Sequence, residues 1–193
     1  MTSRLDEQAA LALLHYDPRW LEYGLIDAET LQLQVDHYYS TGGSSLEHYR
    51  YAAFQYILAS HSTLSDEQIL QYIELARLDE DAAGMAQAAL CDLIQWRKLS
   101  AEQFDWLSLH SEFATPRFQK LIVRRRLIEA LNSEAPSAED FAHCLASNDA
   151  IVHRYLVDHV TLTRAQLQDL AEFGASRTVR NIAKDRLRRK GIG

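Results

Sequence analysis

The sequence predicts an all-α protein, a right-handed α-α superhelix of about five two-helix repeats that follow an N-terminal capping helix. Only 3 prolines and 7 glycines occur in 193 residues, which is too few for the many tight turns of a sandwich or barrel. A phrase typical of helix starts recurs along the chain. The intervals from Leu25 to Leu64, Leu99, Pro136 and Leu162 are 39, 35, 37 and 26 residues, the range of helical-hairpin repeats.

In each copy of this phrase, Ser, Thr or Asp is placed to cap a helix, and a polar residue follows three positions later. Ser65, Ser100 and Thr163, each followed by Gln, fit the capping box, and the preceding Leu is available as a hydrophobic staple. The copies are Ile26-Asp-Ala-Glu-Thr30, Leu64-Ser-Asp-Glu-Gln68, Leu99-Ser-Ala-Glu-Gln103, Pro136-Ser-Ala-Glu-Asp140 and Leu162-Thr-Arg-Ala-Gln166.

An N-terminal helix is expected from about Ser3 to His15, ended near Asp17-Pro18, and residues 1–24 would cap the stack. Each repeat then divides at a polar break into a first and a second helix. The repeats are predicted at 25–63, 64–98, 99–135, 136–161 and 162–193, and together form one domain, 1–193. Second helices are predicted at 46–60, 85–96, 117–131, 151–160 and 177–189.

The last of these segments carries a family resemblance. Val179-Arg180, followed by Ala183 and Leu187, resembles the second-helix signature of HEAT-like repeats. The resemblance covers roughly residues 25–193 as architecture, and its recognisable residues lie in the last repeat. It implies an α-solenoid whose second helices line the concave surface. Tetratricopeptide repeats suit the intervals near 35, but their Trp, Gly and Tyr positions are absent and the fourth repeat is too short for them.

Charge is divided along the chain. Up to Pro116 there are 6 basic and 18 acidic residues, a net charge of -12, and the remainder has 14 basic and 9 acidic residues, a net charge of +5. Such a division can orient a partner or a second copy of the chain, and it also arises by drift on solvated helix faces.

No catalytic or cofactor pattern occurs. Cys91 and Cys144 are expected to be buried thiols. Trp96 and Trp106 are core or groove residues, and their positions at the end of one helix and in the middle of the next favour core. No two histidines have the i, i+4 spacing of metal ligands on one helix face, and neither a phosphate loop nor a nucleophile elbow is present. We therefore expect no enzyme activity, no metal and no cofactor. Ala9–Leu14 is too short for a secretory leader and no run is long enough for a membrane span, so we expect a cytoplasmic protein without membrane contact.

Three groups of residues are candidates for binding. Tyr38, Tyr39 and Tyr49 flank the Ser40–Ser45 loop and are expected to anchor a protein partner, whereas packing within the first repeats explains Phe54 and Tyr56 of the same cluster equally well. The triplet Arg124, Arg125 and Arg126 places Arg125 on an apolar helix face, where it pairs with an acidic residue of the adjacent repeat or contacts a partner. Arg177, Arg180, Lys184 and Arg188 form one side of the last helix, either a phosphate-binding ridge or a solvated face.

These features favour a non-catalytic protein-binding module, such as an adaptor, scaffold or immunity-type protein, whose acidic first half suits a basic partner. The alternative is a nucleic-acid-binding HEAT-like protein, including one related to DNA repair, that uses the basic C-terminal helices. A third alternative is a homo-oligomer in which the acidic half of one copy meets the basic end of another.

Overall fold

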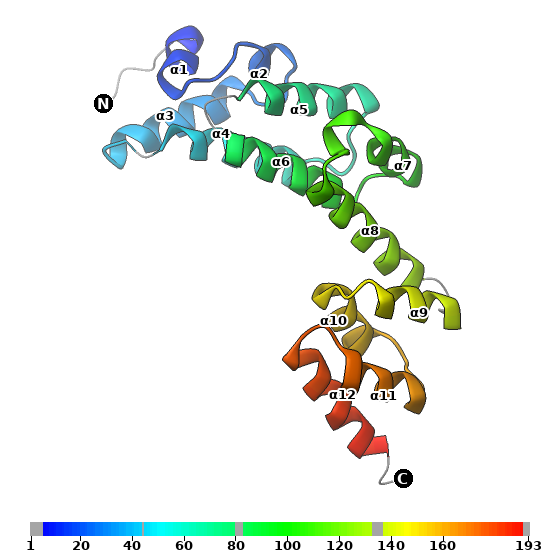
Figure 1. Cartoon of the computed structure of the whole chain (residues 1–193). Coiled ribbons are helices and arrows are strands. Elements are labelled where there is room, and N and C mark those ends of the chain that lie inside the picture. The colour runs from blue at the N-terminus through cyan, green and yellow to red at the C-terminus, as the bar shows by residue number, and fades with distance from the viewer. Residues whose placement is uncertain (1–5, 44, 80–82, 133–136, 191–193) are drawn as a thin grey trace. The chain divides into compact units, whose positions relative to one another are not determined.

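The computed structural model describes residues 6–43, 45–79, 83–132 and 137–190. All regular secondary structure in these ranges is helical, with no strand, which confirms the all-α prediction (Figure 1). The chain divides into two compact units, Met1–Ala114 (unit 1) and Thr115–Gly193 (unit 2). The boundary falls within the third predicted repeat. The arrangement of all repeats in one right-handed superhelix stays a prediction.

Unit 1 begins with the predicted N-terminal helix and continues with helix pairs. The predicted start of the first helix near residue 3 lies outside the described residues, and a short second helix was not predicted. The helices are α1 (Glu7–Leu14), α2 (Arg19–Glu22), α3 (Ala28–Ser40), α4 (Leu46–Ser60), α5 (Asp66–Leu78), α6 (Ala83–Gln95) and α7 (Ala101–Leu109), followed by a 3-10 helix, Ser111–Phe113.

Unit 2 contains α8 and two further helix pairs. Its helices are α8 (Pro116–Leu131), α9 (Ala138–Ala146), α10 (Ala150–His159), α11 (Arg164–Phe173) and α12 (Arg177–Lys190). The second helices of all five predicted repeats are thus present within two residues of their predicted bounds at each end.

The recurring phrase marks the helix starts as predicted. Ser65, Ser100, Ser137 and Thr163 each accept a hydrogen bond from the amide three residues later, and the side chain of that later residue accepts one from the capping amide. Asp27 caps α3 by accepting from the Thr30 amide at 2.7 Å. Each such cap is worth about 1 kcal/mol, because it satisfies a backbone donor that the helix leaves without a partner.

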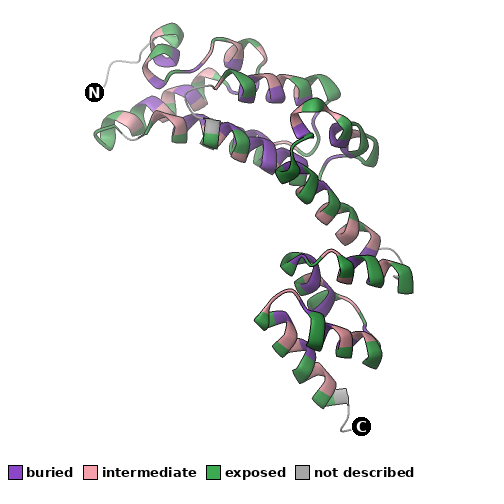
Figure 2. Cartoon of the chain, in the orientation of Figure 1, coloured by how far each residue is buried: buried purple, intermediate pink, exposed green. Residues whose placement is uncertain are grey.

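Aromatic side chains form much of the core of unit 1. The Trp20 ring lies 4.6 Å from the ring of Phe54, and Phe54 lies 4.7 Å from Tyr72. Trp96 is buried as predicted, and its indole N–H donates to the Leu58 carbonyl at 2.8 Å. Each helix therefore has a buried side and an exposed side, which Figure 2 shows in purple and green. Burial of Trp20 explains why the short α2 forms without a helical period of its own.

The core of unit 2 surrounds a fully buried histidine. His153 is 0% exposed, and its Nδ1 accepts from the Ala175 amide at 2.9 Å while its Nε2 donates to the Cys144 carbonyl at 2.9 Å. These two neighbours require a neutral ring protonated on Nε2. The ring, carried by α10, thus joins the last turn of α9 to the α11–α12 turn.

Both cysteines are buried, as predicted. Burial, followed by the nearby Asp140 carboxylate, raises the pKa of the Cys144 thiol to about 11. None of the helices in the described part of the chain combines the length and apolar character that crossing a membrane requires.

Candidate functional site

The three candidate tyrosines lie together beside the α3–α4 loop, but they differ in exposure. The Tyr38 ring contacts the rings of Tyr39 and Tyr49 edge-on, with centroids 5.6 and 6.2 Å apart. Tyr49 is 6% exposed, its hydroxyl lies 3.0 Å from His37 Nδ1, and its carbonyl accepts a hydrogen bond from the Tyr16 hydroxyl. Tyr49 therefore holds α3 against α4, whereas Tyr39, 50% exposed, presents its ring at the surface.

The arginine triplet of α8 is largely engaged within unit 2. Arg124 donates through Nε and Nη2 to one oxygen of Asp149, at 3.1 and 2.9 Å, and so supplies the link to an adjacent hairpin that was expected of Arg125. Arg125, whose side chain is 12% exposed, pairs with Glu129 of its own helix at 2.7 Å. Arg126 is exposed. Arg124 and Arg125 thus each have a carboxylate partner.

Asp149 combines two structural tasks. Its second oxygen accepts from the Ile151 amide at 2.8 Å and caps α10. Burial, the largest influence, raises the pKa of this carboxyl, but hydrogen bonds from Arg124 and from backbone amides together outweigh it and leave the pKa lowered. The Arg124–Asp149 pair therefore stabilises unit 2 in its ionised form.

The basic side of α12 is only partly open to a ligand. Arg177 and Lys184 are exposed. Arg180 is half-buried and donates to the Gly174 carbonyl at 2.6 Å, which satisfies the end of α11, and Arg188 lies 3.1 Å from Asp185. The four residues follow one side of the helix, but Arg180 acts as a backbone cap and a carboxylate partly neutralises Arg188.

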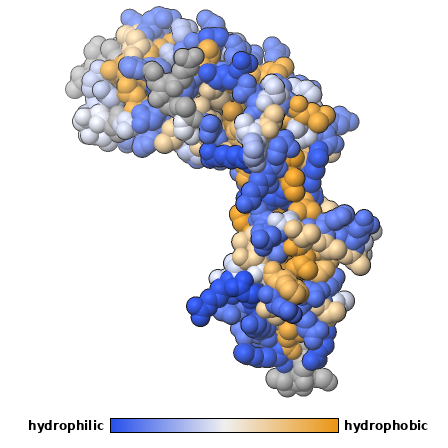
Figure 3. All heavy atoms as spheres, viewed as in Figure 1, coloured by the Kyte–Doolittle hydropathy of each residue, from blue (hydrophilic) through white to orange (hydrophobic). Residues whose placement is uncertain are grey.

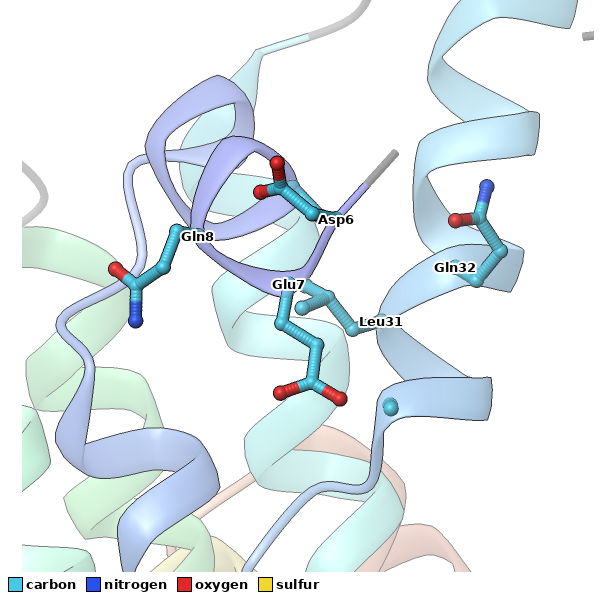
Figure 4. Close-up of a pocket in the computed structure, with 7 residues that line it drawn as sticks. Asp6, Glu7, Gln8, Leu31 and Gln32 are labelled. Atoms are coloured by element: carbon cyan, nitrogen blue, oxygen red, sulfur yellow. The ribbon is translucent and has the colours of Figure 1, made fainter. Parts of the chain in front are cut away.

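A first hollow of about 500 Å³ lies between α1 and α3. Figure 4 shows the Glu7 side chain extending between the two helices beside Leu31, while Asp6 turns back over the first turn of α1. The Asp6 carboxylate accepts from the Ala9 amide at 2.7 Å, so it caps α1. The polar side chains of the wall, Asp6, Glu7, Gln8 and Gln32, point in different directions in Figure 4, so the hollow does not converge them on a ligand.

A second, smaller hollow of about 200 Å³ lies above a buried ion pair. Arg50 Nε and Nη2 contact one oxygen of Asp79 at 2.9 and 2.7 Å, and Arg50 Nη1 donates to the Leu14 carbonyl at 3.2 Å. Both side chains of the pair are 6% exposed. The pair joins α4 to the end of α1 and to the residue after α5, which is a structural role.

The most open apolar surface of unit 1 lies on α5 and α7. Gln103 of α7 donates to the Leu64 carbonyl and to the Asp66 carboxylate, both at 2.9 Å, at the starts of the two helices. Near their ends Arg77 of α5 pairs with Glu112 of the 3-10 helix at 3.1 Å. The two helices thus run side by side in the same direction.

Between them is a hollow of about 530 Å³, which we call the α5–α7 groove. Its lining residues are Leu70, Ile73, Glu74, Arg77 and Leu78 of α5 and His110 at the end of α7. The Trp106 ring contacts His110 edge-on, with centroids 5.6 Å apart, and so extends this surface along α7. Hydrophobic residues reach the surface around α7 and along α8 in Figure 3.

Four large apolar side chains on α5 and α7 are exposed. Leu109 is 86% exposed, Leu70 is 46% exposed, and Trp106 and Leu78 are each 38% exposed. The prediction that Trp106 is a core residue is therefore wrong. On the nine-residue α7, Phe104 and Leu107 supply the buried side, and Trp106 and Leu109, three residues apart, share the opposite side.

The helices at the rims of the α5–α7 groove are acidic. Asp66, Glu67, Glu74, Glu102, Asp105 and Glu112 lie on α5, α7 and the 3-10 helix, where Arg77 is the one basic residue. Glu74, which lines the groove, pairs with Arg19 of α2 at 2.7 Å and accepts from the Tyr23 hydroxyl at 2.8 Å. An apolar surface with such rims was not predicted from the sequence. The sequence signal that would have indicated this surface is the pair Trp106 and Leu109, which falls outside the apolar period of Phe104 and Leu107.

Comparisons with known proteins give no relatives for this chain: a scan against protein-family models and searches of curated proteins and of solved structures each found no match. The function of this chain is therefore inferred from the exposure, contacts and charge of its own residues.

Proposed function

We propose that this chain is a non-catalytic protein-binding module, an α-solenoid of the HEAT-like type that takes a basic protein partner on unit 1. It would serve as an adaptor, scaffold or immunity-type protein. The observation that carries the proposal is the match between charge and structure. Unit 1, residues 1–114, has 6 basic and 18 acidic residues, a net charge of -12, whereas unit 2 has 14 basic and 9 acidic residues, a net charge of +5.

Charge segregated in this way favours a partner of opposite sign, because complementary fields speed association and disfavour other partners. The exposed Leu70, Trp106 and Leu109 add a second reason. Apolar and aromatic side chains at the centre of an interface supply most of its affinity, and charged rims mainly supply its specificity.

Affinity capture from native lysate tests the proposal. We expect one basic protein to be recovered in stoichiometric amount at about 0.05 M salt and to be lost at about 0.5 M, where charges are screened over a few ångströms. Recovery of no stoichiometric protein at low salt would count against a protein-binding function.

A second candidate function is nucleic-acid binding by unit 2, favoured by the exposed Arg177 and Lys184 of α12. Against it, Arg124, Arg125 and Arg188 have carboxylate partners and Arg180 caps a helix. Titration of a fluorescent duplex at low salt decides between the two candidates. A saturable rise in anisotropy that Arg177→Gln with Lys184→Gln removes would support duplex binding, and unchanged anisotropy would exclude it.

A further inference from the structure

We propose that the α5–α7 groove is the docking site for an amphipathic basic helix of the partner protein. The inference rests on the proposed function and names its site and the chemistry of its ligand. The apolar side of the partner helix occupies the groove over Leu70 and Leu78 and reaches Trp106, whose ring contacts the groove residue His110. Its Lys and Arg side chains face the acidic rims.

The dimensions of the groove suit a helix. α5 has 13 residues, and at 1.5 Å per residue this is roughly 20 Å, the length of a helix of similar size. Leu70 and Leu78 are eight residues apart, so they lie about 80° apart around α5, on one broad side of it, and roughly 12 Å from each other along its axis. Anchor side chains seven residues apart on a docked helix have a similar separation.

Charge decides which helix docks. α5, α7 and the 3-10 helix carry six carboxylates, Asp66, Glu67, Glu74, Glu102, Asp105 and Glu112, against the guanidinium of Arg77 and that of Arg19, which pairs with Glu74 at 2.7 Å. Arg77 is itself paired with Glu112. A helix with acidic sides would meet like charges on both rims, whereas one with basic sides meets opposite charges, which selects the partner by repulsion as well as attraction.

Trp106 supplies a probe of docking. The chain has 3 tryptophans, of which Trp20 is 2% exposed, Trp96 is 9% exposed and Trp106 is 38% exposed. A helix laid over the groove dries the Trp106 ring, while Trp20 and Trp96 are dry already. A blue shift of tryptophan emission on binding is therefore assigned to Trp106.

The test titrates the full chain with a synthetic 18-residue helical peptide that has leucine at i, i+3, i+4 and i+7 spacing and lysine elsewhere. We expect a saturable blue shift, absent from Trp106→Phe, and at least tenfold weaker binding by Leu70→Ser and by Leu78→Ser. The matched control is Leu33→Ser on α3. It makes the same substitution at a leucine that is 64% exposed and lies outside the groove, so peptide binding should be unchanged. The same peptide with glutamate in place of lysine should not bind.

Equal binding by Leu70→Ser, Leu78→Ser and Leu33→Ser would overturn the site, and equal binding of the glutamate peptide would overturn the charge argument. Sedimentation of the chain alone gives a further check. A dimer that Leu70→Ser dissociates would overturn the proposal by making a second copy the occupant. Capture of a basic protein that Leu70→Ser and Leu78→Ser retain would reject the groove alone, whereas capture of no protein would reject the proposed function.

Discussion

Replacing Asp79 with alanine is expected to destabilise unit 1 by about 3–5 kcal/mol, because it leaves the buried charge of Arg50 without its carboxylate. The side chains of Arg50 and Asp79 are both 6% exposed. Once the Asp79 carboxylate is removed, the described acceptor left to Arg50 is the Leu14 carbonyl, 3.2 Å from Nη1. Since domains are stable by about 5–15 kcal/mol, the loss removes a large fraction of the free energy of unfolding.

Urea titration followed by tryptophan emission measures this change, because Trp20, Trp96 and Trp106 all lie in unit 1. With a denaturant dependence of about 2 kcal/mol per molar, the midpoint should fall by about 2 M. Replacing both partners, Arg50→Met with Asp79→Leu, should restore most of the lost stability, because no charge is then left buried alone.

The matched control is Glu112→Gln, which breaks the pair with Arg77 in the same unit. The Arg77 side chain is 64% exposed, so this change should cost less than about 1 kcal/mol. If Asp79→Ala lowers the midpoint no further than Glu112→Gln does, the reasoning about the buried pair is wrong.

Three further predictions concern unit 2. The pKa of Asp149 is lowered in the folded chain, so the stabilising effect of this carboxylate is present above the unfolded pKa of about 3.9 and is lost as pH falls through the folded pKa. The difference in free energy of unfolding between wild type and Arg124→Gln, measured by urea titration with circular dichroism, should therefore narrow below about pH 4. A constant difference would contradict this. His153→Leu should lower the free energy of unfolding by about 2–4 kcal/mol and abolish the slow hydrogen exchange of the Ala175 amide, because this amide loses its acceptor. Unchanged exchange would refute the role of His153 as that acceptor. At pH 8, Cys144 should react with iodoacetamide about 100-fold more slowly in the native chain than in guanidinium, because its pKa of about 11 lowers the thiolate fraction. Site-resolved mass spectrometry measures the two rates, and comparable rates would contradict the raised pKa.

The sequence predicted the helix boundaries well because local chemistry determines them. Ser65, Ser100 and Thr163 bind amides three residues away, so the whole interaction is visible in a short stretch of sequence. The four-residue α2 escaped prediction, because burial of Trp20 against Phe54, far along the chain, stabilises it.

The α5–α7 groove was not predicted for the same physical reason. Whether Leu70 or Leu109 is exposed depends on which side of its helix a neighbouring helix covers, and no local pattern settles this in a helix as short as α7. Arg125 illustrates the converse case. Its place on an apolar face correctly indicated a carboxylate partner, but that partner, Glu129, is on the same helix.

The claim that the acidity of unit 1 selects a basic protein partner is tested most directly by quantitative capture with charge-neutralised chains. Glu67→Gln with Glu102→Gln removes two exposed carboxylates from the rims of the α5–α7 groove, and Glu139→Gln with Glu172→Gln removes two exposed carboxylates from unit 2. We expect wild type and the unit 2 variant to recover the same basic protein at low salt, and the unit 1 variant to recover several-fold less. Equal recovery by all three chains, or recovery of no stoichiometric protein by any of them, would contradict the claim.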